Sequence, residues 1–87
     1  MNLFFLKTIK NKEIILFFMN ILVVDDSEDV RLLVETWLKS SKHSVILAKD
    51  GNECIKKLSK NIELIILDIM MPGPSTKKII KSINKKI

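Results

Sequence analysis

Three short apolar runs, separated by stretches with helical periodicity, constrain the fold of this chain. The runs cover residues 21–24, 45–47 and 64–67, and they consist of Val, Ile and Leu alone. Strands of this kind are typical of a parallel sheet that is buried on both faces. Because the runs alternate with helical stretches, the sequence predicts an α/β fold with right-handed crossovers and helices on both faces of the sheet.

The helical stretches indicate where each helix begins and which side it buries. Five apolar residues share the spacing of one helix face, which predicts that this face lies in the core: Val30, Leu33, Val34, Trp37 and Leu38. Asp50 stands three residues before Glu53 and predicts a capped second helix. Ser75 is expected to cap a third helix, whose isoleucines form its apolar side.

Residues 1–18 stand outside this alternation. We expect them to be an N-terminal extension that precedes a domain over residues 19–87, with Met19 as its natural start. The rival interpretation is that residues 14–24 form one long strand or an added helix. The sequence leaves both interpretations open.

Length and composition limit the number of domains and the cellular location of the protein. Eighty-seven residues suffice for one small domain. The apolar runs at 3–6 and 14–19 are shorter than the roughly 20 residues that span a bilayer, and no signal-peptide cleavage pattern follows them. Cys54 is the single cysteine, so an intramolecular disulfide and a Cys-based metal cluster are excluded. We therefore expect a cytoplasmic protein without membrane contact.

Charge is unevenly distributed along the chain. The net charge is +5, with acidic residues clustered at 25–29 and lysines at 77–86. No aromatic residues alternate with these lysines, as a stacking platform for bases would require. Direct nucleic-acid binding is therefore not expected, and a basic nucleic-acid binder, whose affinity would fall steeply with salt, is kept only as a competing hypothesis.

Carboxylates follow two of the apolar runs at the points where the strands are expected to end. Asp25 and Asp26 follow the first run, and Asp68 follows the third. In an open parallel sheet, ligands bind beyond the carboxyl ends of the strands. If the two strands are neighbours, three carboxylates converge, and their repulsion raises the pKa of one of them unless a cation is bound. Carboxylate oxygens suit Mg²⁺, and a carboxylate can attack a phosphorus atom.

Simpler interpretations exist for the same residues. Adjacent aspartates before a helix, such as Asp25 and Asp26, also serve as helix caps and dipole partners. His43 has no second His or Cys at metal-ligand spacing and is expected in a solvated connection.

Two acidic motifs make the interpretation specific. Val23-Val24-Asp25-Asp26 and Leu67-Asp68-Ile69-Met70-Met71-Pro72-Gly73 resemble the acidic motifs of response-regulator receiver domains, and the similarity runs from about Asn20 to Ser75. The resemblance implies a flavodoxin-like parallel sheet that is incomplete, with three strands and three helices of the usual five each. It also implies a phosphoacceptor domain of two-component phosphorelay signal transduction, which is a signalling domain and not an enzyme.

The resemblance assigns a role to each site residue. Asp68 would accept a phosphoryl group from a histidine kinase or a phosphotransfer protein, with Mg²⁺ as cofactor. Asp68 and Asp26 would ligate the metal directly, and Asp25 would act mainly through water. The backbone carbonyl of Met70 would complete the protein ligands, and Pro72 would shape the loop that aims it.

The resemblance fails at two functional positions of the family. The hydroxyl residue that ends the fourth strand and the lysine that ends the fifth have no counterpart among these residues. By analogy with lost oxyanion donors, a missing charge at a transferring phosphoryl group costs on the order of 10²- to 10³-fold in rate. The omission would also leave the strand at 64–67 as an exposed sheet edge, where a second copy or a partner chain could pair.

That exposed edge suggests a second function, a non-enzymatic interaction fragment that is indifferent to Mg²⁺. A phosphatase of the haloacid-dehalogenase type is a further hypothesis. It requires a second aspartate two residues after the nucleophile, where this chain has Met70.

Overall fold

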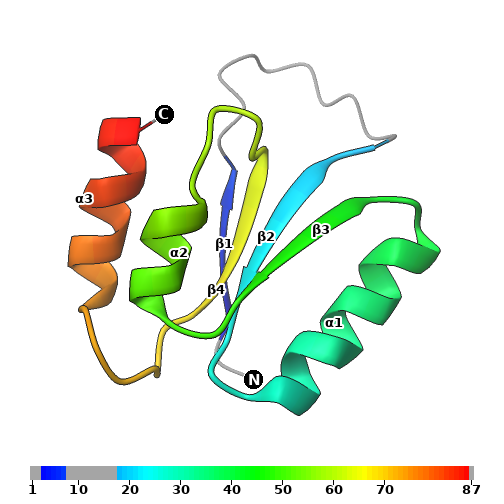
Figure 1. The fold of residues 1–87 in the computed structure, drawn as a ribbon, viewed down its shortest axis with the longest axis horizontal. Coiled ribbons are helices and arrows are strands. Elements are labelled where there is room, and N and C mark those ends of the chain that lie inside the picture. Colours follow the sequence, from blue (N-terminus) through cyan, green and yellow to red (C-terminus); the bar gives the residue numbers. More distant parts are fainter. Residues whose placement is uncertain (1–2, 8–17, 87) are drawn as a thin grey trace.

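The computed structural model describes residues 3–7 and 18–86, and its elements alternate from residue 20 onward as predicted (Figure 1). The elements are β1 (Leu3–Lys7), β2 (Asn20–Val24), α1 (Glu28–Ser40), β3 (Ser44–Ala48), α2 (Gly51–Lys57), β4 (Leu64–Asp68) and α3 (Thr76–Lys86). The described strands form one sheet in the order β1-β4-β2-β3, in which β2 pairs in parallel with both β3 and β4. The predicted α/β fold, with three parallel strands and three helices, is confirmed.

The helices cover both faces of the sheet, and successive residues of β2 point to opposite faces. Leu22 and Val24 belong to a cluster with residues of α2 and α3, whereas Ile21 and Val23 pack with Val34 of α1. These four side chains are almost fully buried. This explains why the run is wholly apolar, since a strand covered on both faces has no side that tolerates polar residues.

The prediction that the whole apolar face of α1 lies in the core is wrong for Leu33 and Trp37. Val34 is buried, but the side chains of Leu33 and Trp37 are 45% and 56% exposed. Among the described elements, α1 contacts only β2 and β3, so Val34 lies at the centre of its buried side and the other two lie on its flank. A helix that packs on a sheet without a neighbouring helix buries a narrower stripe than the sequence pattern suggests.

The prediction that the third predicted strand is an exposed sheet edge is also wrong. β1 pairs antiparallel with β4, from Leu3 opposite Asp68 to Lys7 opposite Leu64 (Figure 1). The backbone groups on the outer side of β4 therefore have partners within the chain. The rival strand or helix was placed on residues 14–24. Of these, residues 14–17 lie outside the described residues, and β2 begins at Asn20. The extension over residues 1–18 stays a prediction.

Caps and close packing fix α2 and α3. The predicted caps are confirmed, since Asp50 Oδ1 accepts a hydrogen bond from the N–H of Glu53 at 2.7 Å and Ser75 Oγ accepts one from Lys78 at 3.2 Å. A Cβ atom added to Gly51 would lie 2.8 Å from Ile79 Cδ1. Glycine at the start of α2 thus allows the close approach of α3.

His43 is not the solvated loop residue that the sequence suggested. It is half-buried, and its Nδ1 accepts a hydrogen bond from the N–H of Met19 at 3.1 Å. The imidazole thereby links the connection before β3 to the residue before β2.

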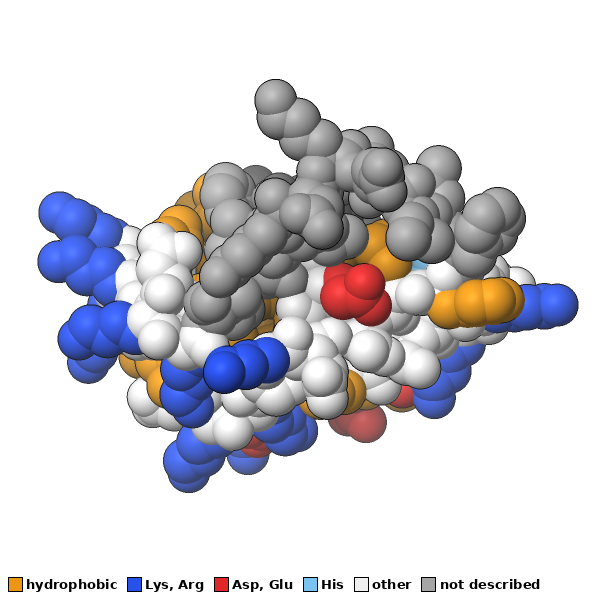
Figure 2. All heavy atoms as spheres, turned by 90° about the horizontal axis from the view of Figure 1, so that it is seen from above, with side chains coloured by type: hydrophobic (Ala, Val, Ile, Leu, Met, Phe, Trp, Pro, Cys, Tyr) orange, Lys and Arg blue, Asp and Glu red, His pale blue; other side chains and the backbone are white. Residues whose placement is uncertain are grey.

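Lysines gather at one end of the molecule. Figure 2 shows a group of basic side chains at the end where α3 lies, and fewer at the opposite end. The helix contains no acidic residue, and its lysines are Lys77, Lys78, Lys81, Lys85 and Lys86. None of the described helices has the length and apolarity needed to cross a membrane.

We expect Cys54 to resist thiol reagents in the folded protein. Its side chain is fully buried, and this burial raises the pKa of the thiol to about 11, so at pH 8 only about one thiol in a thousand is ionised. Labelling should therefore follow unfolding of the chain. The measurement is the rate of labelling with and without urea, and native labelling as fast as that of a free thiol would contradict the described packing.

Candidate metal centre

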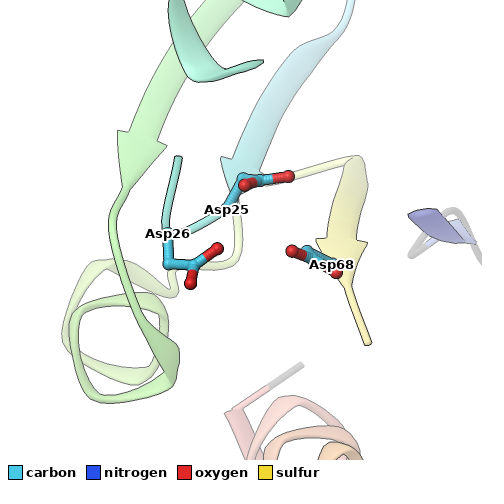
Figure 3. A group of neighbouring side chains, drawn as sticks. All are labelled: Asp25, Asp26 and Asp68. Carbon is cyan, nitrogen blue, oxygen red and sulfur yellow. The ribbon is translucent and has the colours of Figure 1, made fainter. Parts of the chain in front are cut away.

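Three carboxylates meet at the carboxyl edge of the sheet. β2 and β4 are parallel neighbours with Val24 opposite Leu67, so the residues that follow in each strand reach the same edge. One carboxylate oxygen each of Asp25, Asp26 and Asp68 lies within 4.8 Å of the others (Figure 3). The expected convergence is confirmed.

The three side chains differ in burial and in how firmly they are held. Asp25 is 3% exposed, Asp68 is half-buried and Asp26 is exposed. Asp25 Oδ1 accepts a hydrogen bond from the N–H of Ser27 at 2.9 Å. The backbone of Asp25 is fixed too, because its N–H donates to the carbonyl of Ala48 at 3.1 Å and its carbonyl accepts from the Arg31 guanidinium at 2.7 Å. Asp25 is therefore a rigid part of the site.

Burial raises the pKa of the Asp25 carboxyl. The hydrogen bond from Ser27 acts in the opposite direction, while the neighbouring charges of Asp68 and Asp26 raise the pKa further and Arg31 lowers it. A buried carboxylate with two like charges this close is electrostatically unfavourable unless it binds a proton or a cation. Three hard oxygen donors at this separation fit a divalent cation such as Mg²⁺.

The capping interpretation of the adjacent aspartates does not hold. The N-cap of α1 is Ser27, whose Oγ accepts a hydrogen bond from the N–H of Val30 at 3.3 Å. Asp25 and Asp26 precede the cap, and their carboxylates face Asp68 (Figure 3). The sequence pattern did not reveal the parts that Ser27 and Arg31 have in holding Asp25.

The loop after β4 is anchored on the site. Asp68 Oδ1 accepts a hydrogen bond from the N–H of Met70 at 2.9 Å, and the Met70 side chain is 70% exposed. Gly73 has a φ of +104°, a backbone conformation that favours glycine. The exposed side chain agrees with a role for the backbone of Met70 and not for its thioether.

Replacing Asp25 with asparagine should stabilise the metal-free protein at neutral pH. Because the pKa of Asp25 is raised in the folded state, its contribution to stability is complete below the ordinary value of 3.8 and is lost as pH rises through the folded value. Asparagine has no charge to bury and keeps an oxygen for the Ser27 N–H. The higher stability of the Asp25→Asn protein relative to the wild type should disappear below pH 3.8.

With Mg²⁺ bound, we expect the wild type to be more stable than the Asp25→Asn protein. At a Mg²⁺ concentration ten times its dissociation constant, the wild type gains about 1.4 kcal/mol, and the Asp25→Asn protein gains less. The measurement is the urea midpoint at pH 7 with and without Mg²⁺. Asp50→Asn is the matched control, since asparagine caps a helix as well as aspartate. A urea midpoint of the wild type that is the same with and without Mg²⁺ would contradict the metal site.

Comparisons with known proteins agree with this geometry. A model of the response regulator receiver domain family matches residues 21–87. The chain is similar to Response regulator RR06 of Streptococcus pneumoniae serotype 2, with 44% identity over 69 residues, which are 78% of this chain and 32% of that protein. It is also similar to Regulatory protein VanR of Enterococcus faecium, with 44% identity over 69 residues, or 76% of this chain and 29% of the relative.

Transcriptional regulatory protein ResD of Bacillus subtilis is 39% identical over 67 residues, covering 76% of this chain and 28% of ResD. The chain thus spans about a third or less of the length of these relatives. No solved structure shows a significant match. The family match begins at Ile21, directly after the first residue of β2, and it includes all three carboxylates. With its fold and its carboxylate cluster, the chain belongs to the response-regulator receiver domain family of two-component signalling.

Proposed function

We propose that Asp68 is the phosphoacceptor of this receiver domain and takes a phosphoryl group from a histidine kinase or a phosphotransfer protein. The observation that carries the proposal is the position of its carboxylate, half-buried at the sheet edge and within 4.8 Å of the carboxylates of Asp25 and Asp26. Of Asp25, which follows β2, and Asp68, which ends β4, Asp25 is buried and hydrogen-bonded to Ser27. Asp68 is the more accessible nucleophile.

The transfer itself requires little from the protein beyond placement. An oxygen of Asp68 forms a bond to phosphorus while the bond from phosphorus to the donor's imidazole nitrogen breaks, and the electron pair of that bond returns to the imidazole. The hydrogen bond from Met70 to Asp68 Oδ1 holds the carboxylate in one orientation. This is catalysis by positioning, as in other phosphoryl transfers.

The donor set supports Mg²⁺ as the cofactor. Asp26 and Asp68 would bind it directly, Asp25 would bind mainly through water, and the carbonyl of Met70 would complete the protein ligands. When bound, Mg²⁺ neutralises carboxylate charge and allows an anionic phosphoryl group to approach. Arg31 is placed to keep Asp25 oriented through its hydrogen bond to the Asp25 carbonyl.

The test is phosphorylation of the purified chain by a small phosphodonor such as acetyl phosphate. We expect one added phosphoryl group by intact mass spectrometry in Mg²⁺ and none after chelation with EDTA. Peptide mapping should place the group on Asp68. Modification at another residue, or modification that proceeds equally well without Mg²⁺, would refute the proposal.

A further inference from the structure

The outer strand β1 is held by one described neighbour. It pairs with β4 at five residue positions, and among the described elements it contacts β4 alone. Figure 1 shows β1 at the edge of the sheet beside β4. The contacts among β2, β3, β4 and the three helices do not involve β1, so β1 can leave the edge without breaking any of them.

The connection to β1 is long for the distance that it covers. Lys7 pairs with Leu64, and Leu64 also pairs with Ile21, so the end of β1 and the start of β2 lie two strand spacings apart, about 10 Å. Residues 8–19 join them, and twelve residues can reach about 40 Å. A connection of this length can place β1 on its own β4 or on the β4 of a second molecule.

The empty edge favours one occupant. When β1 leaves, the outer N–H and C=O groups of β4 lose their partners, which costs free energy until another strand pairs there. The β1 strand of a second copy restores the same backbone pairs, from Leu3 opposite Asp68 to Lys7 opposite Leu64. An identical strand from a second copy therefore fits the free edge of β4, because it has the same sequence and pairs in the same register.

We propose that β1 is exchanged between two copies of this chain, each copy placing its β1 on the β4 of the other. The closed monomer and the exchanged dimer contain the same strand pairs. The balance between monomer and dimer therefore depends on the protein concentration relative to the effective concentration within one chain, which is in the millimolar range for short linkers. The intact chain is monomeric at micromolar concentration, and a shortened connection favours the dimer. This proposal does not depend on the phosphoacceptor role of Asp68.

Deleting residues 8–17 tests the exchange. The two residues that remain reach only about 7 Å, less than the roughly 10 Å between the end of β1 and the start of β2. We expect light scattering at about 10 μM to give twice the mass of one shortened chain, while the intact chain is monomeric. A monomeric shortened chain would overturn the proposal.

A cross-link identifies which strands pair. Shortened chains with Lys7→Cys are mixed with shortened chains with Leu64→Cys, both with Cys54→Ala. Directly opposite residues of an antiparallel pair lie about 4.5–5.5 Å apart at Cα, within reach of a disulfide. We expect a disulfide between the two kinds of chain and none when Lys39→Cys replaces Lys7→Cys. A dimer without this disulfide would overturn the exchange.

The same cysteine pair serves in the intact chain if the shortened chain does not fold. Mixed intact chains are refolded together at about 1 mM, where intermolecular pairing competes with the intramolecular one. After dilution and oxidation, the expected product is the same disulfide between the two kinds of chain. Its absence after refolding at both micromolar and millimolar concentration would overturn the proposal.

Discussion

Replacing Asp68 with asparagine is expected to abolish phosphorylation of the chain and to weaken Mg²⁺ binding by at least about 10- to 100-fold, because even residues that only support metal ligands cost that much. The amide oxygen of asparagine can still accept the hydrogen bond from the N–H of Met70, so the loop after β4 should keep its conformation. The amide is not a nucleophile toward phosphorus at neutral pH. Intact mass spectrometry with acetyl phosphate and a Mg²⁺ titration followed by NMR measure the two effects.

Asp50→Asn is the matched control for this experiment. Asp50 is also an aspartate and lies two residues after the end of β3, but its carboxylate caps α2 and does not belong to the cluster. The control should be phosphorylated and should bind Mg²⁺ like the wild type. Undiminished phosphorylation of the Asp68→Asn protein would place the acceptor elsewhere.

Replacing Ile65 with alanine is expected to lower the free energy of unfolding by about 2–5 kcal/mol, the usual cost of a large cavity in a core. Ile65 is the second residue of β4, is fully buried and belongs to the cluster that joins the sheet to α2 and α3. A chain of this length has a total stability of about 4–13 kcal/mol. The substitution therefore removes a large part of it, and urea unfolding should show a lower midpoint with an unchanged slope.

Ile46→Ala provides the comparison. Ile46 lies on β3 in the same sheet, but its side chain is 40% exposed, so truncation leaves little cavity and should cost less than about 1 kcal/mol. Equal losses at the two positions would mean that the described division between core and surface is wrong.

The core and the carboxylate cluster were predictable because both depend on local patterns. Each buried strand is a continuous apolar run, and parallel neighbours necessarily bring Asp25 and Asp68 to one edge. The exposure of Trp37 was not predictable, because helical periodicity gives the direction of a side chain but not whether another element packs there. The bond from Arg31 to the Asp25 carbonyl depends on side-chain conformation, which leaves no sequence pattern.

The pairing of β1 was missed for a related reason. A short apolar run such as residues 3–6 is compatible with many structures, and its partner is far away along the chain. Sequence patterns describe neighbours in the chain well. They describe poorly the contacts between segments with many residues between them.

The register of β1 on β4 also has a consequence for synthesis on the ribosome. Leu3 emerges early and pairs with Asp68, so the first described strand to be made waits for the last one. At about 5–20 residues per second, that delay lasts several seconds. During this time the apolar segment of β1 has no partner strand and can bind chaperones or other nascent chains. It becomes the edge strand of the sheet only after β4 has been synthesised.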